Sequence, residues 1–271
     1  MALFWLRVAL GCYAVGLVYI LVSLGRTSEW ANRIALQAAY LGMIFEFVSL
    51  AENIFPARQI TLAAEHNAEP LLAFLIMAMF MVVYLIYKTT SPGIIVFPLV
   101  FLLTFVAATG EERFLSMVPS TRKDWLIVHI ALIFFGYAAL ILSFGASFVY
   151  LIQERALKSK RSNGLLSRLP ALQVLDDISF RSLAVGFPCM TLGLLAGIVV
   201  AQATYGRVQY SDPKILLSIL MWAVYLLLIY TRWTAGWRGR RAAYLATGAF
   251  ATAIIAWAAN YFSAIHGFVR S

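Results

Sequence analysis

The chain has 271 residues, of which 62% are hydrophobic and only 12% are charged, and its mean hydropathy is +0.85. Soluble globular domains carry about 25% charged residues, so this composition excludes a soluble domain and indicates an integral membrane protein. The net charge of +9 would also suit a nucleic-acid-binding protein. In a membrane protein, however, basic residues first indicate which side of the bilayer a connection occupies.

Eight apolar segments, separated by short polar connections, follow one another along the chain. About 20 apolar residues cross the bilayer core as a helix, and these segments lack the alternation of barrel strands. The sequence therefore predicts an all-α polytopic membrane helix bundle of about eight transmembrane helices, in a single integral-membrane domain over residues 1–271. The first segment lacks a basic leader and a cleavage site, so we expect it to remain as a span. The expected spans are 4–24, 34–54, 71–87, 94–109, 125–152, 182–203, 215–231 and 243–262.

The basic residues lie mainly in connections that share one side of the expected membrane. Thirteen of the 21 Lys and Arg residues fall in these connections, and the positive-inside rule makes that side cytoplasmic. Both termini are then expected on the outer side, periplasmic or extracellular, of a cell inner membrane. Orientation and contact with anionic lipids explain the basic runs, so we expect membrane lipids as partners and no nucleic acid.

The longest expected cytoplasmic connection covers residues 153–181 and contains the run SKRSNGLLSRLPALQVLDDISF. This run predicts a charged turn followed by a short amphipathic helix in the interface. On that helix Leu169, Leu172, Leu175 and Ile178 would face lipid.

The expected topology places all three histidines of the chain, His66, His129 and His266, on the outer side. A neutral imidazole is a common protein ligand of haem iron and zinc. If the fifth and eighth spans are neighbours, His129 and His266 would face each other across a shallow pocket and supply both axial ligands of a haem. The plainer alternative is that each histidine lies at the headgroup level beside a helix end, and the residues alone favour that alternative.

Groups that would surround a haem lie near the same outer face. Trp125 and Tyr210 would supply flat apolar walls, and Arg122 and Arg207 would pair with propionate groups. Aromatic residues at this depth are also expected from the interfacial belt of a membrane protein, so they do not discriminate between the two alternatives.

Two glutamates lie within the second span, Glu46 near its middle and Glu52 near its outer end. A carboxyl group in hydrocarbon is a functional candidate, either as a proton carrier or as the partner of a cation. Arg7 lies at the depth of Glu52, which predicts an ion pair between them. For Glu46 we expect a protonated carboxyl group hydrogen-bonded to Tyr13 or to another helix, with a proton path as the alternative.

The run WLIVHIALIFFGYAALILSFGASFVYLIQE resembles a helix of the cytochrome c assembly family, of the CcsA and HemX type, which opens with a Trp, an outer-face His and a later Tyr-Ala-Ala-Leu. These are Trp125, His129 and residues 137–140. The resemblance covers about residues 125–268, the four C-terminal helices, whereas residues 1–110, the four N-terminal helices, resemble the family only loosely. It continues through residues 175–206, SDPK at 211–214, YTRWTAGWRGRRAA at 230–243 and the final AANYFSAIHGF, which contains His266.

In that family the paired outer histidines are the axial ligands of a haem held for delivery to apocytochrome c. The resemblance therefore implies that His129 and His266 bind the iron of a haem b, with Asp212 of the Asp-Pro-Lys element among its surroundings. It also implies a role in cytochrome complex assembly, with apocytochrome c or a larger membrane partner that recruits it. His66 has no secure counterpart in the family and would be an alternative ligand.

The sequence departs from the family pattern at two places. The tryptophan-rich loop before Asp-Pro-Lys is reduced to YGRVQYSDPK, where Gln209 and Ser211 stand in place of family tryptophans, and Tyr230 stands where the family has a membrane histidine. These losses resemble the short HemX-like branch, and they predict a protein that holds or presents haem without haem-lyase activity of its own. The alternatives are a regulator or scaffold for haem-synthesis enzymes and a b-haem electron-transfer subunit of a larger complex.

Overall fold

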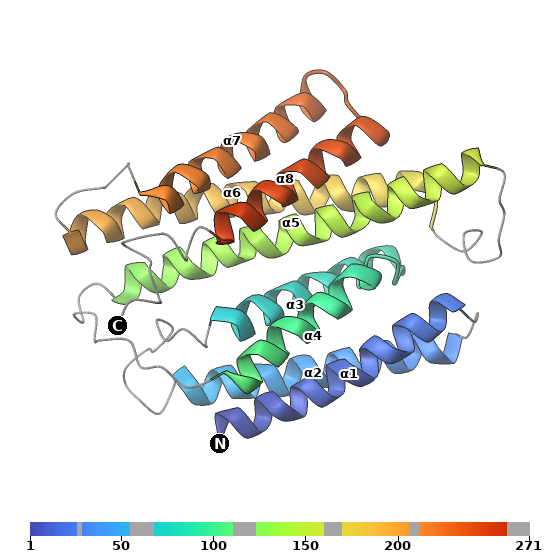
Figure 1. The fold of residues 1–271 in the computed structure, drawn as a ribbon, viewed down its shortest axis with the longest axis horizontal. Helices are drawn as coiled ribbons and strands as arrows, with labels where there is room; N and C mark the ends of the chain where they lie inside the picture. Colours follow the sequence, from blue (N-terminus) through green and yellow to red (C-terminus); the bar gives the residue numbers. More distant parts are fainter. Residues whose placement is uncertain (26–28, 55–67, 111–122, 160–169, 206–211, 259–271) are drawn as a thin grey trace. The chain divides into compact units, whose positions relative to one another are not determined.

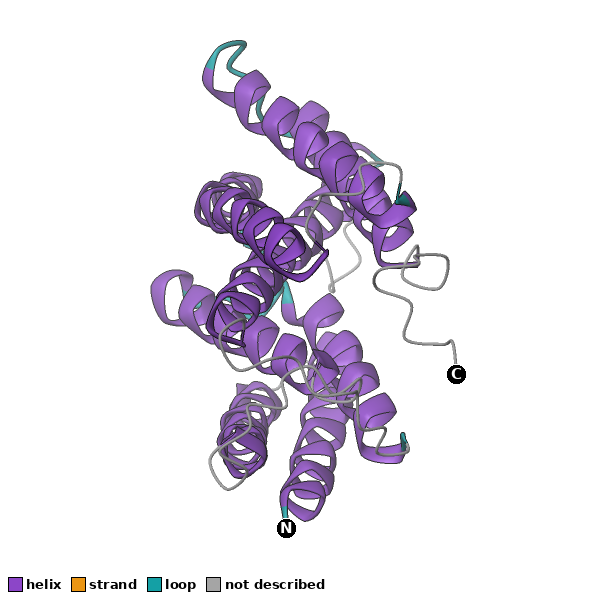
Figure 2. Cartoon of the chain, turned by 90° about the vertical axis from the view of Figure 1, so that its left-hand side faces the viewer, coloured by secondary structure: helices purple, strands orange, loops and turns teal. Residues whose placement is uncertain are grey.

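The computed structural model describes residues 1–25, 29–54, 68–110, 123–159, 170–205 and 212–258. These residues form eight helices and no strand (Figures 1 and 2). Each helix overlaps one expected span, which confirms the all-α prediction. The helices are α1 (Ala2–Gly25), α2 (Glu29–Ile54), α3 (Ala68–Tyr87), α4 (Gly93–Thr109), α5 (Lys123–Lys158), α6 (Leu172–Tyr205), α7 (Pro213–Trp233) and α8 (Arg240–Ala258).

The surface of these helices is apolar, as a bilayer requires. Six of them, α1, α2, α3, α5, α6 and α7, are long and apolar enough to cross a membrane, and α4 is a shorter apolar helix. Large apolar side chains that a soluble protein would bury are exposed on every helix. The protein is therefore a multi-pass membrane protein. Examples, one from each helix in order, are Val18, Phe47, Leu85, Leu102, Ile152, Leu192, Leu227 and Ile255.

The chain divides into two compact units, residues 1–117 with 156–170 and residues 118–155 with 171–271. Unit 1 contains α1 to α4. Its helices approach one another closely where an aromatic ring of one helix packs against a glycine of another. A Cβ atom on Gly16 of α1 would lie 2.7 Å from the ring of Phe97 on α4. One on Gly42 of α2 would lie 2.6 Å from the ring of Tyr13 on α1. Lipid supplies no hydrophobic force between helices, so such close contacts are what stabilises the unit.

Unit 2 is built on the antiparallel pair α5 and α6 (Figure 1). The two helices meet along a line that we call the α5–α6 seam, in which contact residues follow one another at steps of three, four or seven, as in a coiled coil. The approach is closest at glycines: a Cβ atom on Gly136 would lie 3.0 Å from Cβ of Met190, and one on Gly186 would lie 2.3 Å from Cβ of Ala139. The seam consists of His129, Ile133, Gly136, Ser143 and Ser147 on α5 and Ser179, Gly186, Met190, Gly193 and Gly197 on α6.

The remaining helices of unit 2 pack on this pair. Tyr225 of α7 is fully buried and donates its hydroxyl to the carbonyl oxygen of Gly136 at 3.4 Å. On α8, Phe250 stacks on Phe144 of α5 with ring centroids 4.1 Å apart. Successive helices of the unit therefore run in opposite directions, so the start of α5, the end of α6, the start of α7 and the end of α8 share one end of the unit.

The helix α6 begins at Leu172, ten residues before the expected span. The separate interfacial helix predicted for this region is wrong, because residues 172–181 are the first turns of a continuous α6. Leu175 and Ile178, expected to face lipid, are buried, while Leu169 lies outside the described residues. The apolar periodicity continues from residue 172 into the span without a helix breaker, and the two aspartates of this stretch are paired with arginines.

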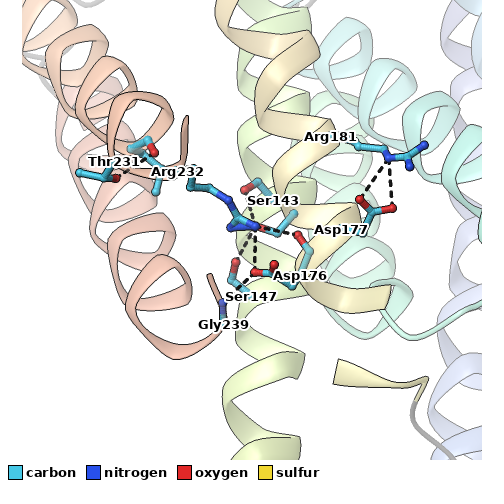
Figure 3. A network of polar contacts seen from close by, with 10 residues as sticks. Ser143, Ser147, Asp176, Asp177, Arg181, Thr231, Arg232 and Gly239 are labelled. Carbon is cyan, nitrogen blue, oxygen red and sulfur yellow. Dashed lines mark hydrogen bonds and ion pairs between the residues drawn. The ribbon is translucent and has the colours of Figure 1, made fainter. Parts of the chain in front are cut away.

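A polar network at the other end of unit 2 joins three helices through Asp176 (Figure 3). Arg232 of α7, whose side chain is only 6% exposed, pairs with Oδ1 of Asp176 at 2.8 Å and also donates to its backbone carbonyl at 3.1 Å. The backbone N–H of Gly239, just before α8, donates to the same Oδ1 at 3.1 Å. Gly239 has φ +64°, which glycine adopts without strain, and a Cβ atom there would meet the Tyr150 hydroxyl at 2.7 Å.

Two neighbouring polar contacts complete the network. The Oγ atom of Ser179 lies 3.0 Å from that of Ser143 and 2.9 Å from that of Ser147, so hydroxyl groups continue the seam toward Asp176. Asp177, by contrast, pairs with Arg181 one turn along α6 at 3.1 Å, and the two side chains are 38% and 66% exposed. Adjacent aspartates therefore occupy a buried and an exposed ion pair.

Replacing Asp176 by Ala should destabilise the protein by about 3 kcal/mol, because the buried Arg232 guanidinium and the Gly239 N–H would lose their acceptor. The matched control is Asp177→Ala, which breaks only the exposed pair and should cost less than about 1 kcal/mol. Thermal unfolding of the purified protein in detergent measures both changes. Equal destabilisation by the two variants would contradict the role assigned to Asp176.

Candidate functional site

His129 lies near the start of α5, on the α5–α6 seam, with its side chain half-buried. Its Nδ1 atom lies 2.7 Å from the backbone carbonyl oxygen of Gly193 on α6. A carbonyl oxygen only accepts hydrogen bonds, so Nδ1 carries a proton and donates it. In the neutral imidazole the lone pair is then on Nε2.

The ring of His129 occupies a space that exists because residue 197 is a glycine. A Cβ atom on Gly197 would lie 2.7 Å from Cε1 and 2.9 Å from Nδ1 of His129. One turn earlier on α6, a Cβ atom on Gly193 would lie 2.9 Å from Cγ1 of Ile133. The two glycines thus leave a groove on α6 that receives two side chains of α5.

This arrangement suits a ligand of a metal-containing group. A metal-ligating histidine nearly always donates its second ring N–H to a backbone carbonyl or a carboxylate, which orients the ring and raises the basicity of the ligating nitrogen. Within the described ranges, no three or more His, Cys, Asp or Glu residues are grouped so that they could hold a metal ion. The described residues therefore form no multidentate metal centre, and the chemistry available at this place is that of an oriented imidazole.

Two further predicted residues are described at the same end of unit 2. Trp125, one turn before His129, has its side chain 53% exposed, as expected for the interfacial belt. Asp212 is 6% exposed and immediately precedes Pro213, the first residue of α7, and its carbonyl accepts the N–H of Leu216 at 3.1 Å. An aspartate before a proline at the first helical position is a typical helix start, so Asp212 has a structural role in beginning α7.

Five other residues predicted for the site lie outside the described residues. They are His266, His66, Tyr210, Arg122 and Arg207. Their roles remain predictions from the sequence. The two glycines that contact His129 were not predicted, although a signal was present: they form a Gly-x-x-x-Gly motif in an apolar helix, which marks a close helix approach.

Glu46 belongs to unit 1, where its side chain is fully buried. Its Oε2 accepts a hydrogen bond from the Tyr13 hydroxyl of α1 at 2.8 Å, which confirms the expected contact. Its Oε1 accepts one from the Thr104 hydroxyl of α4 at 3.2 Å. Both carboxyl oxygens are thus paired with hydroxyl groups from neighbouring helices, and the group needs no cation.

Glu52 has a different partner from the one predicted. Its Oε1 accepts a hydrogen bond from the indole N–H of Trp5 at 3.1 Å, whereas the side chain of Arg7 is exposed. The predicted pair between Arg7 and Glu52 is therefore wrong. Arg7 follows Trp5 by two positions, which turns its side chain to about the opposite side of the helix.

Comparison with known proteins decides the family. The family described as "Cytochrome C assembly protein" matches residues 8–265, nearly the whole chain. The chain belongs to this family. The match includes the helices of unit 1, which resemble the family only loosely in their motifs, as well as those of unit 2.

Several curated relatives of the family are similar to this chain, and each bears the name "Cytochrome c biogenesis protein CcsA". That of Guillardia theta is 28% identical over 200 residues, which cover 66% of this chain and 65% of the relative. That of Prochlorococcus marinus (strain MIT 9312) is 31% identical over 161 residues, which cover 52% of each. That of Heterosigma akashiwo (strain NIES-293 / 8280G21-1) is 26% identical over 219 residues, 67% of this chain and 68% of the relative. The chain thus spans about half to two thirds of the length of these relatives.

The contacts of Glu46 predict how two substitutions of similar shape will differ. Glu46→Gln retains an oxygen that accepts from Tyr13 and places an amide next to Thr104, so it should cost less than about 1 kcal/mol. Glu46→Leu leaves both buried hydroxyl groups without an acceptor and should cost about 2 kcal/mol. Thermal unfolding in detergent compares them. If Gln were as destabilising as Leu, an ionised carboxylate rather than a neutral acceptor would hold the three helices together.

Proposed function

We propose that this protein is a haem-binding membrane protein of cytochrome c assembly, which holds or presents a haem b at the outer face through His129 and His266. Membership of the cytochrome C assembly protein family supports this proposal. The observation that carries it is the 2.7 Å contact between Nδ1 of His129 and the Gly193 carbonyl, because it orients the ring and favours the tautomer whose Nε2 carries the lone pair.

The described residues fit a haem in their donor chemistry. His129 offers an imidazole nitrogen near the start of α5, and the large apolar side chains of Trp125 and Val128 on the same stretch of helix are exposed. An imidazole and apolar surface are what haem iron and its flat macrocycle require. When bound, the haem would supply the iron that takes axial imidazoles and the prosthetic group that a c-type cytochrome needs. The contribution of this chain would be to bind that group and orient it.

The register of α5 against α8 supports His266 as the second ligand. Phe144 of α5 stacks on Phe250 of α8, and Glu154 of α5 pairs with Arg240 of α8 at 3.9 Å, so the two helices are antiparallel. His129 precedes Phe144 by 15 residues, and His266 follows Phe250 by 16 residues. The end of α8 therefore lies at the same end of the unit as the start of α5, and His266 follows that end in the sequence.

The helices themselves would provide the rigidity that such a site needs. The α5–α6 seam holds the ring of His129, while the Asp176 network ties the start of α6 to the end of α7 and the start of α8. A ligand from α5 and a ligand that follows α8 would then be carried by elements that are fixed at the opposite end of the unit. We place the protein in the inner membrane of the cell, with the histidines on the outer side.

Partners follow from the names of the relatives. Those proteins are called cytochrome c biogenesis proteins, so we propose apocytochrome c, or a larger membrane protein that recruits it, as the partner of this chain. Haem-lyase activity is not proposed for the chain alone, because Gln209 and Ser211 replace family tryptophans. Tyr230 replaces a family membrane histidine, so this position offers no imidazole either. Its side chain is 59% exposed on α7.

Single substitution of the histidines tests the proposed ligands. His129→Ala and His266→Ala should each abolish the Soret band of the purified protein, because loss of one axial ligand from a shallow membrane-end site releases the haem. The matched control is His66→Ala, which removes the third outer-side histidine and should leave the band unchanged. Absorption spectra at equal protein concentration, with size-exclusion profiles to confirm folding, provide the comparison.

Three results would contradict the proposal. An unchanged Soret band in both His129→Ala and His266→Ala would exclude them as ligands. Loss of the band in His66→Ala with retention in His266→Ala would assign the second ligand to His66. A wild-type protein that takes up no haem would favour a regulator or scaffold of haem-synthesis enzymes instead.

A further inference from the structure

We propose that Gly193 and Gly197 are positioning residues for His129: the Gly193 carbonyl selects the Nδ1–H tautomer, and Gly197 provides the space in which the ring is held. The selected tautomer makes Nε2 the atom that binds a metal-containing group. The link to haem rests on the function proposed above, whereas the tautomer and its cause can be tested without haem.

The hydrogen bond uses a backbone oxygen that has capacity for a second donor. In α-helix geometry the carbonyl of residue 193 accepts the N–H of residue 197. A carbonyl oxygen has two lone pairs, so it also accepts Nδ1–H of His129 at 2.7 Å. Such a contact between a ring and the backbone of a neighbouring helix requires that no side chain cover the backbone. The Gly-x-x-x-Gly spacing meets that requirement over one full turn of α6.

The space at residue 197 is as important as the acceptor at residue 193. A methyl group on residue 197 would lie 2.7 Å from Cε1 and 2.9 Å from Nδ1 of His129, closer than any side-chain contact allows. Any shift of the α6 backbone or of the ring that relieved this close contact would also change the Nδ1–H···O hydrogen bond. Gly197→Ala should therefore displace the ring, weaken the hydrogen bond and allow the Nε2–H tautomer.

A simpler alternative is that these glycines only permit close packing of α5 and α6. Gly136 distinguishes the two explanations, because it lies on the same seam but does not contact the histidine. A Cβ atom on Gly136 would lie 3.0 Å from Cβ of Met190, a tight contact although less severe than the 2.7 Å contact at Gly197. Gly136→Ala is therefore a matched control for packing. Gly248 on α8, which has open space around its Cα, is a control for the effect of alanine on a helix.

The chain offers a direct measurement because it contains three histidines. In the double variant His66→Ala/His266→Ala, His129 is the only imidazole, and ¹⁵N labelling of histidine then gives the ring signals of this residue alone. Nitrogen NMR of the haem-free protein in detergent micelles distinguishes protonated from unprotonated ring nitrogens. We expect Nδ1 protonated and Nε2 unprotonated at a pH above the titration of the ring, and the same result after Gly136→Ala or Gly248→Ala.

Adding Gly197→Ala to this background should convert the signals to the Nε2–H tautomer or to a mixture of both. In the otherwise wild-type protein, Gly197→Ala should weaken haem binding about tenfold or more, as loss of a partner that orients a metal ligand does in other sites. Gly136→Ala should retain the wild-type affinity. Haem titration followed at the Soret band measures both.

The outcomes separate this inference from the proposed function. An Nε2–H tautomer in the double variant would overturn the inference even if Gly197→Ala failed to fold, and so would an unchanged Nδ1–H tautomer in Gly197→Ala. Equal loss of haem from Gly136→Ala and Gly197→Ala would show that Gly197→Ala weakens haem binding through helix packing, and this result would also overturn the inference. If the NMR results are as expected but the wild-type protein takes up no haem, the tautomer selection stands and the proposed function fails.

Discussion

The close approach of α5 and α6 is the constraint on which the rest of unit 2 depends. In lipid, apolar side chains gain nothing by turning away from the solvent, so two helices stay together where small residues bring their backbones near and where polar groups pair. The seam meets both conditions: glycines lie at the closest points, and hydroxyl groups of three serines bond to one another further along. The same close approach brings the backbone of Gly193 within reach of His129. The orientation of the imidazole thus depends on the carbonyl that this approach exposes at Gly193 and on the space that Gly197 leaves for the ring.

The helices themselves were predictable because the bilayer leaves a chain few choices. A span must be an apolar run of about 20 residues whose backbone groups pair within the helix, so all eight helices could be located from composition alone. The start of α6 was not, because the charged stretch before residue 182, which contains Asp176 and Asp177, was interpreted as a separate interfacial helix. The partner of Asp176, Arg232, lies 56 residues later in the chain, and no local pattern reveals that pairing.

The candidate residues were predictable from the sequence, but most of their partners were not. His129 and Glu46 stand out because a polar side chain in an apolar run must find a partner. Which partner it finds depends on the register between helices: Tyr13 could be proposed for Glu46, but Thr104 of α4 and the Gly193 carbonyl of α6 required the tertiary structure. The error at Arg7 has the same origin, since depth in the membrane was matched correctly while the direction of the side chain around α1 was not.

Electron paramagnetic resonance of the purified protein with ferric haem tests most directly whether two histidines hold a haem at this end of unit 2. Two axial imidazoles produce a six-coordinate, low-spin iron, and this is the spectrum we predict for the wild-type protein. A five-coordinate, high-spin spectrum at full haem occupancy would show that His129 and His266 do not act together as axial ligands.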